Sequence, residues 1–303
     1  MLNIIGHKNI FLTISALAVG AALVAILTFG LREGVDFQGG TLWRVHIQNT
    51  DSQKIEDVFH NDLKVVDAHV TAESTADNYL IKLPAIGEGA HNAYSSNLKT
   101  KFPNIEELSY QSIGPTVGAE LRKNSLIAIA LVLVGISLYI AFAFRKVFRP
   151  VSSWTYGTMT LITLFHDVAI PAGLLAVLGK YANVEIDGNF IVALLVIMGF
   201  SVHDTIVVFD RIRENLMLDR AKSAFAHVVN TSVNQTLARS INTSLTLILV
   251  LVALYFAGPS SLHYFILTLL IGVTTGIYSS IFVASPLLIV WQNFQGQEEK
   301  KRN

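Results

Sequence analysis

Six long apolar stretches dominate the pattern of hydrophobic and polar residues in this chain. They cover approximately residues 10–30, 125–144, 156–178, 190–209, 241–257 and 264–290. Because about 20 apolar residues in a helix span the hydrocarbon core of a bilayer, this pattern predicts six transmembrane helices. The first stretch is too long for the apolar core of a signal peptide, so we interpret it as an uncleaved membrane anchor.

The segment between the first two apolar stretches alternates in the manner of a small soluble domain. Its patterns predict strands and helices in the order βαββαβ, with Asp51 or Ser52 as the N-cap of the first helix. The expected elements are strands at 41–48, 68–73, 78–83 and 105–111 and helices at 52–62 and 89–101. This order is typical of a ferredoxin-like α+β domain.

The predicted elements divide the chain into four parts. These are an N-terminal helix (1–30), the ferredoxin-like domain (31–124), five further transmembrane helices (125–295) and a short tail (296–303). The fold class is therefore an α-helical membrane protein that carries one small α+β domain. A ferredoxin-like domain hosts many functions, so it identifies none by itself.

Composition agrees with a membrane protein. Of the 303 residues, 52% are hydrophobic and 15% are charged, and the mean hydropathy is +0.50. Soluble domains carry about 25% charged residues. The net charge of zero gives no indication of a nucleic-acid partner, and the lack of cysteine excludes disulfides, thiol catalysis and cysteine-ligated zinc.

Basic residues gather on one side of the predicted membrane topology. They lie in the second-to-third connection, in the fourth-to-fifth connection and in the tail: Arg145, Lys146, Arg149, Arg211, Arg213, Arg220, Lys222, Lys300, Lys301 and Arg302. The short connections on the other side carry only Lys180. Since cytoplasmic loops carry the excess of positive charge, both termini are expected in the cytoplasm, with residues 31–124 outside.

Ionisable residues interrupt two of the apolar stretches and precede a third. His166 and Asp167 lie near the middle of the third, His203 and Asp204 lie late in the fourth, and Arg239 precedes the fifth. A charge at the centre of a bilayer costs about 3 kcal/mol or more, and such residues usually mark an ion path. The pattern favours transport over an enzymatic pocket.

Asp204 is the centre of the expected ion path. It would be neutral when it binds a proton and paired with Arg239 when it is ionised. Thr205, Asn242, Thr243 and Ser244 would supply hydrogen bonds and hold water. The alternative for each acid is a static buried ion pair that fixes helix packing. For Asp167 the two interpretations are balanced, and the two histidines could instead be packed in the protein or face a cavity.

The same residues give little indication of catalysis or of metal binding. No His-x-x-x-His spacing is present, and no nucleophile lies beside a base. Ser201 and His203 are two residues apart, which puts them on different faces of a helix. We therefore expect no enzyme activity, no metal site and no cofactor other than the coupling ion.

Two glycine-containing motifs join the predicted domain to the membrane helices. Residues 36–41 include Asp36, Gly39 and Gly40, which suit a tight turn because glycine can adopt positive φ. The motif is too short for a phosphate-binding loop that opens a helix. The return segment contains Gly114, Pro115, Gly118 and Glu120. We interpret the two motifs together as a structural junction.

The last apolar stretch contains two further signals. Gly272 and Gly276 form a G-x-x-x-G motif, which predicts close helix packing. Pro286 lacks a backbone N–H, so it predicts a kink in the sixth transmembrane helix.

Taken in order, the motifs resemble those of the SecF family, the smaller membrane subunits of the bacterial SecD–SecF protein-export complex, which are related to RND transporters. The resemblance covers nearly the whole chain. Its motifs are GVDFQGGT (34–41), GPTVGAE (114–120), FHDV (165–168), VHDTIVVFDRIREN (202–215), QTLARSINTS (235–244) and GIYSS (276–280). The motif at 202–215 is the most specific of these.

The resemblance implies a role in late preprotein translocation, driven by the proton-motive force. It implies partnership with SecD, with the SecY–SecE–SecG channel and with unfolded preprotein, and it makes YidC and YajC candidate partners. It places the chain among the lipids of the bacterial cytoplasmic membrane, with residues 31–124 in the periplasm. Asp204 matches the family's proton-path carboxylate, and Arg239 matches its arginine in the next helix.

Three alternatives stay open at the level of sequence. One is a structural subunit that stabilises the translocon without an ion path. Another is an RND-type exporter of lipids or small molecules, although the segment of about 90 residues outside the membrane is small for that class. The third concerns the ion, since carboxylate and hydroxyl oxygens suit sodium as well as a proton.

Overall fold

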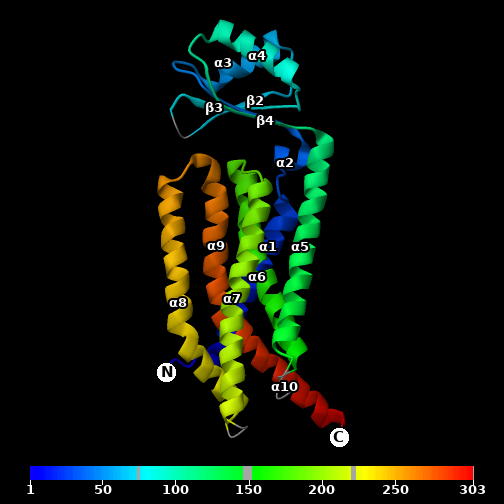
Figure 1. Cartoon of the computed structure of the whole chain (residues 1–303), viewed down its shortest axis with the longest axis vertical. Coiled ribbons are helices and arrows are strands. Elements are labelled where there is room, and N and C mark those ends of the chain that lie inside the picture. Colours follow the sequence, from blue (N-terminus) through cyan, green and yellow to red (C-terminus); the bar gives the residue numbers. More distant parts are fainter. Residues whose placement is uncertain (74–75, 146–151, 220–222, 303) are drawn as a thin grey trace. The chain divides into compact units, whose positions relative to one another are not determined.

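The computed structural model describes residues 1–73, 76–145, 152–219 and 223–302, and it divides into two compact units (Figure 1). The helical unit comprises Met1–Arg32, Ala128–Val184 and Asn189–Asn303. The sheet unit comprises Glu33–Ile127 and Glu185–Gly188. Four basic residues used above to predict orientation, Lys146, Arg149, Arg220 and Lys222, lie outside the described residues.

Within the described residues, six helical spans are long and apolar enough to cross a membrane, the last over Ser260–Gln295, which confirms the six predicted stretches. Several helices extend beyond their apolar cores, and α7 and α8 reach 32 and 33 residues. Their bounds are α1 Lys8–Phe29, α5 Pro115–Ala143, α6 Ser153–Ala182, α7 Gly188–Asp219, α8 Phe225–Ala257 and α9 His263–Ser279. Single-turn helices precede α1 at Ile5–His7 and α9 at Ser260–Leu262.

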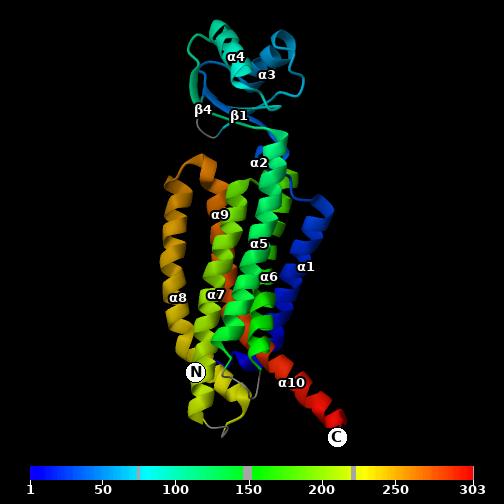
Figure 2. The same ribbon diagram turned by 45° about the vertical axis from the view of Figure 1, so that its right-hand side comes forward.

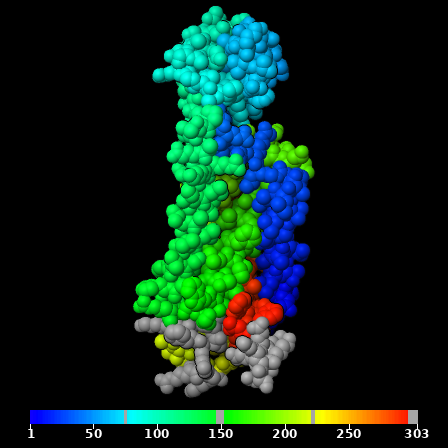
Figure 3. Space-filling view, turned by 90° about the vertical axis from the view of Figure 1, so that its right-hand side faces the viewer, coloured from blue at the N-terminus to red at the C-terminus, as the bar shows by residue number. Residues whose placement is uncertain are grey.

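The packing of the helical unit is uneven. The apolar parts of α6 and α7 are the most buried, together with that of the last span, whereas α1, α5 and α8 expose most of their apolar side chains. α1 packs along α6 and forms an outer edge of this unit (Figures 2 and 3). A side chain at Gly173 would meet the backbone of Ala22, so glycine permits the close approach of these two helices.

The sixth span is broken near its middle. After α9, a π-helical turn runs from Ser280 to Ala284, and α10 (Ser285–Arg302) continues the chain. Pro286 is the second residue of α10, and its missing N–H cannot bond to the π-helical turn that precedes it. The predicted interruption is confirmed, and it takes the form of a wide turn ahead of the proline.

The sheet unit contains the predicted βαββαβ order. Its elements are β1 Gly40–His46, α3 Ser52–Asp57, β2 His69–Ala72, β3 Asn78–Leu83, α4 Glu88–Lys101 and β4 Glu106–Ile113. A π-helical turn, Val58–Asp62, extends α3. All pairs are antiparallel in the order β2-β3-β1-β4, and α3 and α4 cover one face of the sheet (Figure 1). This is the ferredoxin-like arrangement that the sequence predicts.

Strand alternation builds the core of this unit. Trp43 and Val45 of β1 and Ile81 of β3 are fully buried beneath the helices, together with Phe59 and Leu98. The side chain of Asp51 accepts a hydrogen bond from the Lys54 N–H at 2.8 Å, which confirms the predicted N-cap. That bond also holds the pKa of Asp51 below its ordinary value.

Candidate functional site

Asp204 of α7 is buried but loosely held. Its side chain is 3% exposed, and the only hydrogen bond to its carboxylate from the described residues comes from Ser244 Oγ of α8, at a long 3.4 Å. Ser240 lies one turn earlier on the same face of α8, and its buried hydroxyl faces the Asp204 carboxyl but completes no hydrogen bond in the described part of the chain. A carboxylate and a hydroxyl with spare hydrogen-bonding capacity can take up a proton, a water molecule or a cation.

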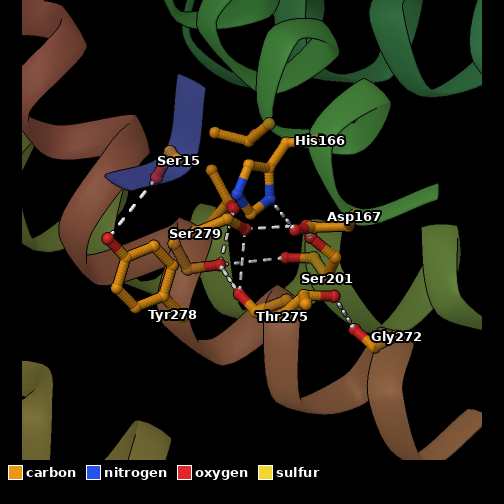
Figure 4. Close-up of polar contacts among 12 residues, drawn as sticks. Ser15, His166, Asp167, Ser201, Gly272, Thr275, Tyr278 and Ser279 are labelled. Atoms are coloured by element: carbon orange, nitrogen blue, oxygen red, sulfur yellow. Dashed lines mark hydrogen bonds and ion pairs between the residues drawn. The ribbon is translucent and has the colours of Figure 1, made fainter. Parts of the chain in front are cut away.

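Asp167 of α6 is held much more tightly. It is fully buried, and both of its carboxylate oxygens are occupied (Figure 4). The Nδ1–H of His166 lies 2.8 Å from Oδ1, and the hydroxyls of Ser201 and Ser279 donate to Oδ2 at 2.5 and 2.7 Å. The cluster joins α6, α7 and the end of α9 at the start of the π-helical turn.

The hydroxyls of Thr205 and Ser280 lie between the surroundings of the two carboxylates. Thr205, which follows Asp204, is hydrogen-bonded to Ser280 at 2.9 Å between the two hydroxyl oxygens. Ser280 follows Ser279 and also lies within hydrogen-bond distance of the Ser201 carbonyl at 3.4 Å. The two acids are therefore neighbours through polar groups of α7 and the π-helical turn, although no described hydrogen bond joins them directly.

The remaining predicted path residues lie elsewhere. His203, Arg239, Asn242 and Thr243 are exposed on α7 and α8. In the described part of the chain, Arg239 makes no direct hydrogen bond or ion pair, although its charge lies near enough to act on the Asp204 carboxyl. Ser240 and Ser244 occupy the buried face of α8, which leaves Arg239 and Asn242 on its exposed side.

Sequence reasoning missed four hydroxyl residues of these clusters. Ser201 lies three residues before Asp204, and Ser240 directly follows Arg239. Ser279 and Ser280 lie in the GIYSS motif. A serine costs little free energy in a transmembrane helix, because its hydroxyl can donate to a carbonyl of the same helix. Its presence in an apolar stretch therefore does not indicate a functional site. The G-x-x-x-G motif was the usable signal: a side chain at Gly272 or Gly276 would meet Ile197 or Ser201 of α7. The predicted close packing is thus confirmed.

The predicted junction forms within the sheet unit. Gly39 and Gly40 have φ values of 79° and 138°, as expected, and they follow the short helix α2 (Val35–Gln38). A Cβ on Gly39 would lie 2.8 Å from Pro115 Cα, and one on Gly118 would lie 2.9 Å from the Gly39 nitrogen. The two motifs therefore pack directly against each other.

The rest of the return segment contains Gly114, Pro115 and Glu120. β4 ends at Ile113, Gly114 follows, and α5 begins at Pro115, a position that favours proline in a helix. Glu120 is exposed and makes no hydrogen bond or ion pair with a described residue. No group of three His, Asp or Glu side chains in the described ranges is placed to hold a metal ion.

Comparison with known proteins identifies the family. Residues 93–294 match the family described as "Protein export membrane protein SecD/SecF, C-terminal", and residues 24–47 match the "SecD/SecF GG Motif". The protein translocase subunit SecF of Thermobaculum terrenum is 45% identical over 306 residues, which covers 97% of this chain and 95% of that protein. The chain belongs to the SecF family of protein translocase subunits.

Longer relatives named SecDF are also similar to this chain. SecDF of Thermus thermophilus is 36% identical over 294 residues, which covers 93% of this chain and 38% of that protein. A crystal structure of Thermus SecDF, described as a translocon-associated membrane protein, matches 96% of this chain and 39% of its own with a TM-score of 0.82 and 32% identity. This SecF-family chain is therefore an accessory subunit of the Sec translocase and a multi-pass membrane protein.

Proposed function

We propose that this SecF-family subunit uses the proton-motive force to promote late preprotein translocation, and that Asp204 takes up and releases the coupling ion. The supporting observation is the contrast between the two buried acids. Asp204 has one long hydrogen bond beside an unpartnered hydroxyl, whereas Asp167 has both oxygens occupied. Only the first can gain and lose a cation without first breaking several contacts.

The remaining path residues have supporting roles in this proposal. Thr205 and the cluster of His166 and Asp167 form a polar layer next to Asp204 and hold α6, α7 and α9 together. A proton that enters down a potential of 100 mV supplies about 2.3 kcal/mol from voltage alone. That energy biases a two-state element about 50-fold, so translocation proceeds in many small cycles.

The exposed polar residues of α7 and α8 support a partner at this face. His203, Arg239, Asn242 and Thr243 are exposed on helices that cross the membrane. Such groups are costly against lipid. We infer that SecD covers them and supplies a carboxylate for Arg239, which completes the path with groups that this chain lacks.

The setting follows from the same proposal. The chain lies in the bacterial cytoplasmic membrane with both termini in the cytoplasm and residues 31–124 in the periplasm. It acts with the SecY–SecE–SecG channel on unfolded preprotein, with YidC and YajC as further candidate partners and with lipids around α1 and α5. The coupling ion is a proton, and sodium is the alternative because the oxygens of Asp204, Ser240 and Ser244 suit both.

Voltage-driven preprotein translocation in vesicles tests this function. The vesicles contain the chain with SecD and the channel, and the variants are Asp204→Asn and Arg239→Met. We expect both to lose the voltage-dependent part of translocation, because the first cannot ionise and the second cannot pair with an acid. Asp57→Asn, the same change at an exposed carboxylate of α3, should behave as the unchanged protein.

The competing function is a scaffold that only stabilises the translocon. The tightly bonded Asp167 cluster is the feature that favours it, since it fixes three helices together. Full voltage-driven translocation by Asp204→Asn, in complexes that assemble normally, would support the scaffold and contradict ion coupling.

A further inference from the structure

The short connection between α6 and α7 belongs to the sheet unit. Residues Glu185–Gly188 cluster with Glu33–Ile127 rather than with the helices that they join. Ile186 forms a parallel bridge with Glu33, and its carbonyl accepts a hydrogen bond from the Gly34 N–H at 2.9 Å. A side chain at Gly34 would lie 3.1 Å from that carbonyl, so glycine permits the contact.

Two charged side chains strengthen this attachment. Lys82 Nζ of β3 lies 2.8 Å from Glu185 Oε1, and the two side chains are 27% and 20% exposed. Asp36 Oδ2 accepts a hydrogen bond of 2.7 Å from the N–H of Gly188, the first residue of α7. The Asp36 carboxylate thereby satisfies one of the free N–H groups at the start of α7 and complements the positive end of the helix dipole.

The helix that is capped in this way is the one that carries Asp204. Gly188 and Asp204 are 16 residues apart in α7, about 24 Å along the axis at 1.5 Å per residue. α7 contains no proline, so it can act as a continuous rod between the two points. The connection between α8 and α9, in contrast, lies in the helical unit.

We propose that residues 185–188, with Lys82 and Asp36, form a coupling clamp that passes a displacement of α7 directly to the sheet unit. Lys82, Glu185 and Asp36 are positioning residues in this assignment and bind no ion themselves. The clamp adds a route to the sheet unit beside the covalent links through α1 and α5. The inference rests on the proposed function, because it assigns the path by which ion exchange at Asp204 reaches the domain outside the membrane.

Charge reversal tests the clamp. Lys82→Glu and Glu185→Lys each place like charges side by side, and the double variant restores an opposite pair. We expect about a fivefold loss of voltage-driven translocation in each single variant, the upper range for a partly exposed ion pair, and recovery in the double variant. Reversal of the Lys101–Asp62 pair, which lies within the same unit at 3.1 Å, should have no effect.

A second readout separates coupling from a structural role and from failure of the proposed function. Ion exchange at Asp204, followed by the infrared band of its carboxyl group, should be unchanged in all three clamp variants. Unchanged translocation in the single variants, or a double variant no better than either single one, would overturn the clamp. Loss of ion exchange in the single variants would also overturn it. Normal translocation by Asp204→Asn would instead reject the proposed function.

Cross-linking tests whether the clamp stays closed. The chain contains no cysteine, so Lys82→Cys and Glu185→Cys introduce a unique pair for a short bis-maleimide. Because the two cysteines remove the ion pair, a rigid clamp predicts that the cross-link restores translocation relative to the same variant without cross-linker. Loss of translocation only after cross-linking would show that these residues separate during the cycle, which contradicts the inference.

Discussion

At the scale of single residues, the two buried acids of the helical unit differ in what holds them. Asp167 accepts from three side chains on three segments, whereas Asp204 accepts one long hydrogen bond. Tight bonding favours a role in holding helices together, and loose bonding favours exchange of an ion. The same contrast gives the two residues opposite expected effects on stability and on translocation.

Alanine substitutions test this contrast in stability. Asp167→Ala leaves buried hydroxyls without their acceptor and should cost about 3 kcal/mol. Asp204→Ala removes an equal volume but only one weak bond, and it should cost less than about 1 kcal/mol beyond the cavity that both variants create. Thermal unfolding of the purified chain in detergent measures the difference, and an equal or reversed order would contradict it.

The sequence predicts those site residues whose side chains cost much free energy in a membrane. Asp204 and Arg239 stand out because a charge among apolar residues is expensive. Ser240 and Ser279 do not, since a serine is tolerated in any transmembrane helix. Whether Arg239 faces Asp204 depends on how α8 is rotated against α7, and a single sequence does not fix that rotation.

At the scale of elements, the six apolar stretches and the βαββαβ order were predictable, because each depends on a local period of side chains. The position of the break in the sixth span was not. Pro286 predicts a kink, but the wide turn at Ser280–Ala284 depends on the neighbouring helices and on how Ser280 is bonded. A local pattern carries no information on such contacts.

The glycine junction yields a prediction at this scale. Gly39 has φ 79° and ψ 162°, a region open essentially to glycine alone, so Gly39→Ala should cost about 1–3 kcal/mol before the clash with Pro115 is counted. Gly89→Ala is the matched control. It lies in α4 with open space around it and should stabilise the chain by about 0.5–1 kcal/mol.

Fluorescence of the full chain measures this pair of variants. Trp43 is buried in the core of the sheet unit, whereas Trp154 and Trp291 are exposed, so a shift on heating reports on the sheet unit. Equal melting temperatures for Gly39→Ala and the unchanged chain would show that the turn tolerates a side chain, against the geometry.

At the scale of the whole molecule, the ion site that we propose at Asp204 lacks a complete path among the described residues. Arg239 and His203 are exposed on helices long and apolar enough to cross a membrane, and SecDF of Thermus thermophilus carries additional sequence beside the part that matches this chain. The sequence alone did not show that residues 185–188 join the sheet unit, because that contact links segments far apart in the chain. Both features fit the proposed assembly, in which SecD and the sheet unit respond to one carboxyl group.

Infrared difference spectroscopy of that carboxyl group is the most direct test. The complex of this chain with SecD is studied in lipid while the pH is lowered. Ion exchange at Asp204 predicts a carboxylic-acid C=O band that appears with acid, is retained in Asp167→Asn and is absent from Asp204→Asn. The same band in Asp204→Asn as in the unchanged complex would show that this residue does not exchange a proton, and the account would be wrong.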